Sequence, residues 1–102
     1  MKAVILLDQR FDISERYRVE LKVLEVEAAG KHPEGVKVSF VLIDVILAVP
    51  RLLVDNHAPF GFHVHEELPL RKEARRLLKT TDYLKALDEF WRLVKEITEN
   101  ES

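Results

Sequence analysis

The stretch from Tyr17 to Val23 constrains the fold most, because apolar and charged residues alternate along it one by one. The apolar set is Tyr17, Val19, Leu21 and Val23, and the charged set is Arg18, Glu20 and Lys22. A period of two places successive side chains on opposite faces of an extended chain. The stretch is therefore predicted to be a β-strand with one buried and one solvated face.

Three further segments are predicted to be strands. Residues 2–8 form a short apolar run. Residues 36–45 alternate at first and are then apolar at every position from 40 to 43. Residues 51–56 follow Pro50, which suits the start of a strand. Residues 10–16 are mostly polar and are expected to connect the first two strands. The alternation slips after Val23, which predicts a bulge near Val23 and Leu24 or a strand end there. Residues 29–35 contain two glycines and a proline and form a loop, and residues 46–49 hold a turn.

The C-terminal part carries the clearest helical pattern. Its apolar stripe consists of Tyr83, Leu87, Phe90, Val94 and Ile97, spaced by three and four residues. A helix from Asp82 to Glu99 would be about 27 Å long. Thr80 or Thr81 is expected to cap it, and Asp82 favours the positive end of the helix dipole. Residues 70–79 are predicted to form most of a second, short helix, with Pro69 at its first position.

These patterns predict an α+β fold: an antiparallel sheet of about four or five strands, with the long C-terminal helix packed on one face. The 102 residues suit a single domain. Within it, residues 1–56 supply the sheet strands, 57–69 a histidine-rich segment, 70–79 a basic segment and 81–99 the helix.

Composition excludes several classes of protein. The chain has no cysteine, which rules out disulfides, thiolate zinc sites and a cysteine nucleophile. The net charge is −2, so no overall positive field attracts nucleic acid, and any such binding must be local. The apolar runs are too short for a membrane span or a signal peptide, so we expect a cytoplasmic protein. Abundant Lys, Arg and Glu with a single Met is typical of thermophile proteins.

Residues 55–67 are the candidate functional segment, because they contain three of the four histidines. His63 and His65 are two residues apart, so an extended backbone directs both imidazoles to the same side. One reading is a general acid and base pair, since histidine titrates near neutral pH. A second is a metal site with His57, His63 and His65 as ligands and Asp55 or Glu66 beside them. A third is a polar loop whose histidines cap strand ends.

Five basic residues follow within nine positions: Arg71, Lys72, Arg75, Arg76 and Lys79. On a helix, four of them would line one face and could hold phosphates beside the histidines. The alternative is an ordinary solvated face. Tyr83, Phe90 and Trp91 share the helical spacing and are predicted to be core residues rather than a platform for stacking bases.

The segment from Val54 to His57, followed by His63-Val64-His65, resembles the TumE-type toxins of prokaryotic type II toxin–antitoxin pairs. The resemblance also covers residues 18–23 and 36–43 and the start of the helix, residues 79–90. It departs from the family where Leu53-Val54 replaces Arg-Tyr, with Arg51 the nearest arginine, and where Phe62 replaces a further histidine. The family pattern implies an edge strand over residues 75–79, which competes with the short helix.

The resemblance implies a metal-independent endoribonuclease that cleaves mRNA without a cofactor and is restrained by a small helix-turn-helix antitoxin. The residues carried over are Asp55, Asn56, His57, His63 and His65. His63 and His65 would act as base and acid with His57 nearby, and Asp55 would orient an imidazole. Asn56, Arg51, Arg75 and Arg76 would contact the RNA.

Two other functions remain open from the sequence. One is a non-catalytic interaction module, either a homodimer formed along a leucine-rich edge strand or a regulator of a neighbouring protein. The other is a hydrolase that uses a histidine-bound metal.

Overall fold

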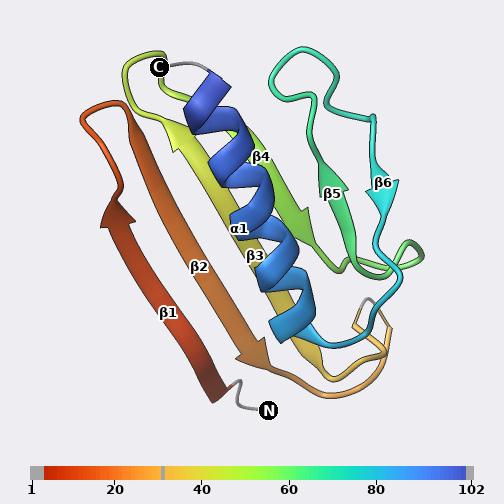
Figure 1. Cartoon of the computed structure of the whole chain (residues 1–102). Coiled ribbons are helices and arrows are strands. Elements are labelled where there is room, and N and C mark those ends of the chain that lie inside the picture. Colours follow the sequence, from red (N-terminus) through yellow and green to blue (C-terminus); the bar gives the residue numbers. More distant parts are fainter. Residues whose placement is uncertain (1–3, 31, 101–102) are drawn as a thin grey trace.

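The computed structural model describes residues 4–30 and 32–100, which form one six-stranded antiparallel sheet and one helix (Figure 1). The elements in chain order are β1 (Val4–Asp12), β2 (Tyr17–Glu25), β3 (Val36–Asp44), β4 (Val49–Asp55), β5 (His63–His65), β6 (Arg76–Leu77) and α1 (Tyr83–Asn100). Each strand pairs with the next one in sequence, so the sheet order is β1-β2-β3-β4-β5-β6. The predicted α+β fold with a C-terminal helix is confirmed.

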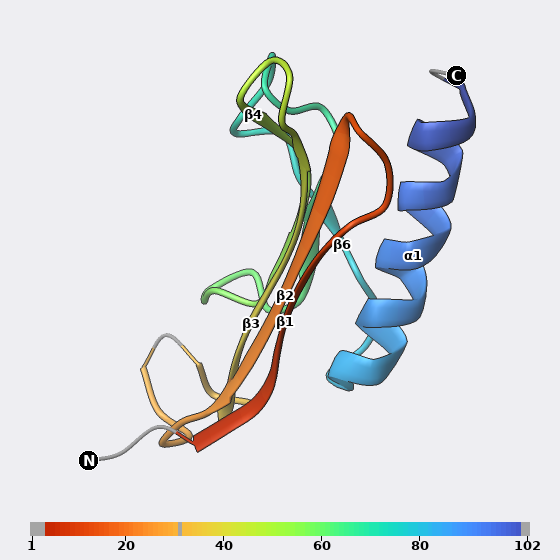
Figure 2. The same cartoon turned by 90° about the vertical axis from the view of Figure 1, so that its left-hand side faces the viewer.

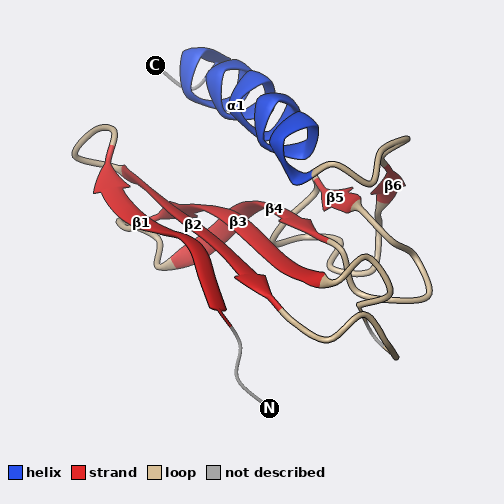
Figure 3. Ribbon diagram, turned by 90° about the horizontal axis from the view of Figure 1, so that it is seen from below, coloured by secondary structure: helices blue, strands red, loops and turns tan. Residues whose placement is uncertain are grey.

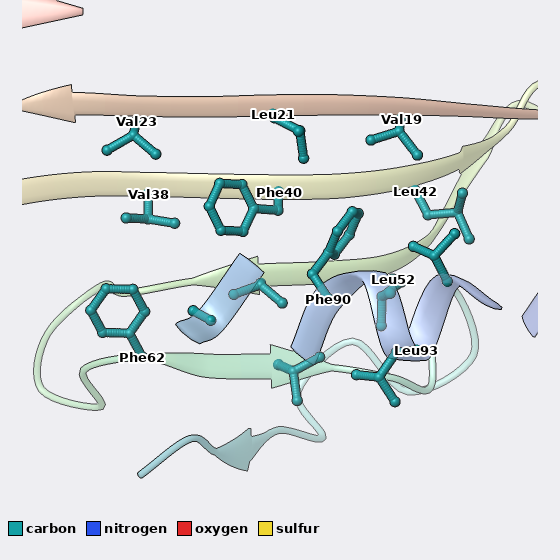
Figure 4. Packing of buried hydrophobic residues seen from close by; sticks show 14 of the residues in the cluster. Val19, Leu21, Val23, Val38, Phe40, Leu42, Leu52, Phe62, Phe90 and Leu93 are labelled. Carbon is teal, nitrogen blue, oxygen red and sulfur yellow. The ribbon is translucent and has the colours of Figure 1, made fainter. Parts of the chain in front are cut away.

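The helix α1 covers one face of the sheet and leaves the other face without a helical layer (Figures 2 and 3). The alternating strand residues and one stripe of α1 form the core between these two layers (Figure 4). Phe90 of α1 lies at its centre, fully buried, with its ring centroid 5.9 Å from that of Phe40. In the described part of the chain, no helix is long and apolar enough to cross a membrane.

The alternation in β2 produces one buried face and one open face, as predicted. Tyr17, Val19, Leu21 and Val23 are buried against α1, and the charged residues between them lie on the open face. β2 nevertheless runs without interruption to Glu25. The predicted bulge lies instead on the neighbouring strand, where Ile5 pairs with Leu24 and Leu7 with Val23, leaving Leu6 as the extra residue.

The first strand is longer than its apolar run suggests. It continues to Asp12, so the prediction that residues 10–16 form a connection is wrong for residues 10–12. Cross-strand pairing explains the extension, because Arg10 lies opposite Glu20 and Asp12 opposite Arg18. Opposite charges on facing strands favour the pairing although the residues are polar. The predicted start at Lys2 lies outside the described residues.

Residues 70–79 do not form a helix, and the prediction of a short helix is wrong. The chain passes through turns and then contributes β6, which pairs with β5 at the edge of the sheet. The edge strand implied by the family pattern is confirmed at Arg76–Leu77, although it is shorter than residues 75–79. Pairing with an existing strand satisfies backbone groups that an isolated two-turn helix would leave exposed.

The helix begins one residue later than predicted, and its cap is Asp82 rather than a threonine. The side-chain Oδ1 of Asp82 accepts a hydrogen bond from the backbone N–H of Leu84 at 2.9 Å. The hydroxyl of Thr80 accepts one from the N–H of Asp82 itself. An aspartate at this position satisfies a free N–H and interacts favourably with the helix dipole.

The turn between β3 and β4 depends on a buried carboxylate, that of Asp44. Its Oδ1 accepts hydrogen bonds from the N–H groups of Ile46 and Leu47, both at 3.0 Å, and its Oδ2 pairs with Arg16 at 2.8 Å. The hydrogen bond from Leu47, followed by the interaction with Arg16, holds the pKa of this carboxyl below its usual value despite burial.

We expect Asp44→Asn to lower the free energy of unfolding at neutral pH. Because the pKa of Asp44 is depressed in the folded state, the carboxylate stabilises the fold above about pH 4 and loses this effect as the pH falls further. Urea titrations at neutral and acidic pH should therefore show a difference between variant and wild type that shrinks at low pH. Asp88→Asn, on the exposed face of α1, serves as the control. An equal difference at both pH values would contradict the role of the charge.

Candidate active site

The end of β4 and the short strand β5 bring Asp55, His63 and His65 together. Asp55 lies opposite His63, and Leu53 lies opposite His65. Val54 and Val64, which alternate with these residues, are fully buried on the side of α1. The two histidines therefore lie on the face of the sheet opposite the helix, as their spacing predicted. The loop of residues 57–61, pale green in Figure 2, projects from this same face.

His63 is the more enclosed member of the pair, with only 2% of its surface exposed. Its Nδ1–H donates a hydrogen bond to the carbonyl oxygen of Gly61 at 2.7 Å, and the ring of Phe60 packs against it edge to face at 5.7 Å. The neutral ring then has its lone pair on Nε2. Among the described residues, the hydrogen bond to Gly61 is the one found for this ring, and it leaves Nε2 for another partner.

Burial determines the protonation of His63. Desolvation lowers the pKa of His63 below its ordinary value of 6.5, and the nearby His65 and Arg75 act in the same direction. The Gly61 carbonyl and the Asp55 carboxylate oppose this effect but do not reverse it. His63 is therefore a neutral imidazole at neutral pH, with Nε2 able to accept a proton.

His65 is held in the same manner by a different segment. Its Nδ1–H donates to the carbonyl oxygen of Ala74 at 3.1 Å, and the side chain is partly exposed. The ring centroids of His63 and His65 are 5.0 Å apart, and the ring planes meet at 78°. Both rings thus have Nδ1 bound to a backbone carbonyl and Nε2 left for other partners. A general acid and a general base each need a nitrogen that is free to exchange a proton with the substrate.

Asp55 lies beside the pair but does not orient an imidazole through a hydrogen bond. Its Oδ1 accepts a hydrogen bond from the backbone N–H of His57 at 3.1 Å, and its effect on His63 is electrostatic. The carbonyls of Gly61 and Ala74 orient the rings instead. The orienting role predicted for Asp55 therefore depends on its charge rather than on a hydrogen bond.

The predicted phosphate-binding arginines lie in different places. The guanidinium of Arg75 is stacked over the ring of Phe60 at 3.9 Å, close to His63. Arg76 points to the other side of the sheet, where it pairs with Glu66 at 2.8 Å and with Glu89 of α1 at 3.3 Å. Successive residues of an extended segment face opposite ways, so β6 separates the two arginines. Arg51 lies in β4 at its register shift with β3.

Asn56, which was predicted to contact substrate, has a structural role in the fold. Its side chain is fully buried, its Oδ1 accepts from the N–H of Val38 at 2.9 Å, and its Nδ2 donates to the carbonyl of Val36 at 2.7 Å. A weaker bond reaches Glu34 at 3.3 Å. The amide thereby satisfies backbone groups of β3 beyond the end of β4.

His57 does not join the pair. It is exposed after the end of β4, and its ring lies 6.2 Å from that of His32, in an edge-to-face arrangement. Within residues 4–30 and 32–100, no three His, Cys, Asp or Glu side chains converge so that they could hold a metal ion. The metal site predicted from His57, His63 and His65 is therefore not assembled.

A cavity of about 400 Å³ opens beside His65 on the same face. It is lined by Val49, Pro50, Leu53, His65, Leu68, Pro69 and Lys72. Most of this lining is apolar, and Lys72 provides a positive charge. The cavity and the histidine pair therefore form one continuous candidate site in which His65 belongs to both.

Three residues of this site escaped the sequence analysis. Phe60 packs on His63 and under Arg75, and the carbonyls of Gly61 and Ala74 orient the two imidazoles. The glycine itself carried a usable signal, because glycine readily adopts the left-handed backbone region, and the structure gives Gly61 a φ of 65°. The sequence held no signal for Ala74, since its contact with His65 exists only after β6 has paired with β5.

Comparison with protein-family models, curated proteins and solved structures finds no match for the chain.

Proposed function

We propose that the protein is a metal-independent endoribonuclease that uses His63 and His65 as a general base and a general acid. The observation that carries the proposal is the geometry of the two imidazoles, 5.0 Å apart and each held at Nδ1 by a backbone carbonyl. The resemblance to TumE-type toxins extends the proposal to a toxin that cleaves mRNA and is restrained by a small helix-turn-helix antitoxin.

Burial keeps His63 neutral, which suits a general base, and the proposal gives the role of general acid to His65. Nε2 of neutral His63 accepts the proton of the ribose 2′-hydroxyl, and the resulting 2′-oxygen attacks the adjacent phosphorus. The bond between phosphorus and the 5′-oxygen breaks, and Nε2–H of protonated His65 supplies the proton to that oxygen. The products are a 2′,3′-cyclic phosphate and a 5′-hydroxyl end. Each proton transfer of this type contributes about 10²- to 10⁴-fold to the rate.

The surroundings of the pair suit an RNA strand. Arg75 lies over Phe60 beside the general base His63, where its guanidinium can neutralise the scissile phosphate. The apolar cavity beside His65 provides room for the nucleobase of the leaving nucleotide, with Lys72 near the next phosphate. An apolar lining contacts any base through its faces, so we expect weak base discrimination at this position.

Cleavage of a short fluorescent RNA as a function of pH tests the proposal. The rate should fall in acid as His63 becomes protonated and fall in base as the general acid is deprotonated, giving a bell-shaped profile. Because burial lowers the pKa of His63, the acidic limb should lie below the ordinary histidine value of 6.5. Activity should survive EDTA, and the products should carry 2′,3′-cyclic phosphates. Loss of activity in EDTA that added Mg²⁺, Mn²⁺ or Zn²⁺ restores would refute the metal-independent mechanism.

A further inference from the structure

The strand β1 forms the long free edge of the sheet. It has nine residues, whereas β6 at the opposite edge has two (Figure 1). A free edge presents backbone N–H and C=O groups that can pair with another strand. The apolar residues of β1 also remain accessible: Val4, Ile5 and Leu6 are 51%, 61% and 43% exposed. Proteins usually block such an edge with proline, bulges or charged side chains. From Leu7 to Asp12 this edge has no proline and no bulge, and its charges are of both signs.

Two exposed charges lie on this edge, Asp8 and Arg10. They are opposite Lys22 and Glu20 of β2, but among the described residues neither forms a close ion pair or a side-chain hydrogen bond. Their neighbour Asp12 differs, because it pairs with Arg18 at 3.0 Å. Asp8 and Arg10 lie on the open face of the sheet, on either side of Gln9. Opposite charges two residues apart suit pairing with the same strand from a second copy.

The arrangement of residues selects one register for such a pair. If two copies of β1 run antiparallel with Gln9 opposite Gln9, then Asp8 of each lies opposite Arg10 of the other. On the face of α1, Leu7 then lies opposite Phe11. Shifting the centre to Asp8 or to Arg10 would place two like charges directly opposite each other, which is destabilising. This register lies within the regular stretch from Leu7 to Asp12, beyond the register shift at Leu6.

We propose that the protein forms a symmetric homodimer through antiparallel pairing of β1 with β1 of a second copy, centred on Gln9. The six strands of each copy then form one continuous sheet, with both helices on the same face. Two Asp8–Arg10 contacts cross the interface, and Phe11, which stacks on Trp91 at 5.7 Å, gains a neighbour from the second copy. The two histidine sites lie near opposite ends of this sheet, on the face away from the helices.

Sedimentation equilibrium of the full chain, with a charge exchange between the two positions, tests the dimer. Wild type should be dimeric, whereas Asp8→Arg or Arg10→Asp alone creates like-charge contacts and should raise the dimer dissociation constant by about tenfold or more. The exchange Asp8→Arg/Arg10→Asp restores opposite charges between the copies, and adding Glu20→Lys and Lys22→Glu keeps them opposite within each copy. This quadruple variant should recover most of the affinity. Asp88→Arg makes the same change in charge on the exposed face of α1 and should leave the dimer unchanged.

Circular dichroism of each variant establishes that it is folded before its mass is interpreted. A wild-type protein that stays monomeric at every concentration would overturn the proposal. Single variants that dimerise like wild type, or a folded quadruple variant as weak as the single ones, would overturn this register. Neither result depends on RNA cleavage, so the dimer and the proposed activity can fail independently.

Discussion

Replacing both His63 and His65 with alanine is expected to reduce RNA cleavage to the level of a control without enzyme. Each imidazole contributes about 10²- to 10⁴-fold when it transfers a proton in the transition state. In the proposed mechanism the two groups act in the same step, so a single replacement should remove most of the activity, and the double variant should lose little more. Initial rates with a single-site RNA substrate at several pH values measure this loss.

The pH profile distinguishes a catalytic role from a structural one. His65→Ala should eliminate the fall in rate at high pH, whereas His63→Ala should eliminate the fall at low pH, in whatever activity remains. His57→Ala removes an exposed imidazole outside the pair and should change the rate little. Thermal unfolding of each variant controls for the partial loss of packing around His63. Unchanged cleavage by the folded double variant would disprove the proposed mechanism.

The second large effect concerns the stability of the fold. Phe90→Ala is expected to lower the free energy of unfolding by about 3–5 kcal/mol. The Phe90 ring is fully buried between α1 and the sheet, 5.9 Å from Phe40 and 5.7 Å from Trp91. Since α1 is the one layer that covers this face in the described part, no neighbouring helix can move in to fill the cavity. A domain of this size has about 5–15 kcal/mol in total, so a large share of its stability would be lost.

Urea unfolding followed by tryptophan fluorescence and by circular dichroism measures this change. Leu84→Ala provides the matched control, because it is on the same helix but is 57% exposed. Its effect should stay within about 0.5 kcal/mol, as is usual for surface positions. If Phe90→Ala cost no more than Leu84→Ala, the packing of α1 on β3 would not be what stabilises this domain.

Local patterns were sufficient to predict the main elements. Alternation in β2 and the three- and four-residue spacing in α1 each arise from one buried face, and burial of that face is what stabilises each element. The same reasoning placed His63 and His65 on one side of an extended segment. Patterns failed where several conformations have similar local preferences. Residues 70–79 have a helical apolar spacing, yet the strand β5 offers backbone partners that favour β6.

The roles of site residues were harder to predict than the elements. Asn56 has the chemistry of a substrate-binding residue, but its position just beyond β4 commits its amide to the backbone of β3. Arg75 and Arg76 are adjacent in sequence and were treated alike. Because β6 is extended, only Arg75 reaches the histidines, and Arg76 pairs with carboxylates on the side of α1.

The sequence by itself determined the two layers and the shared side of the histidine pair, because both follow from the periodicity of single segments. Only the tertiary structure decided which groups surround that pair. Phe60, the carbonyl of Gly61 and the carbonyl of Ala74 reach the imidazoles from two separate loops, and burial there lowers the pKa of His63. Contacts of this kind depend on where distant segments meet, and desolvation depends on everything that covers the group. Neither these contacts nor the desolvation of His63 can be predicted from the spacing of neighbouring residues.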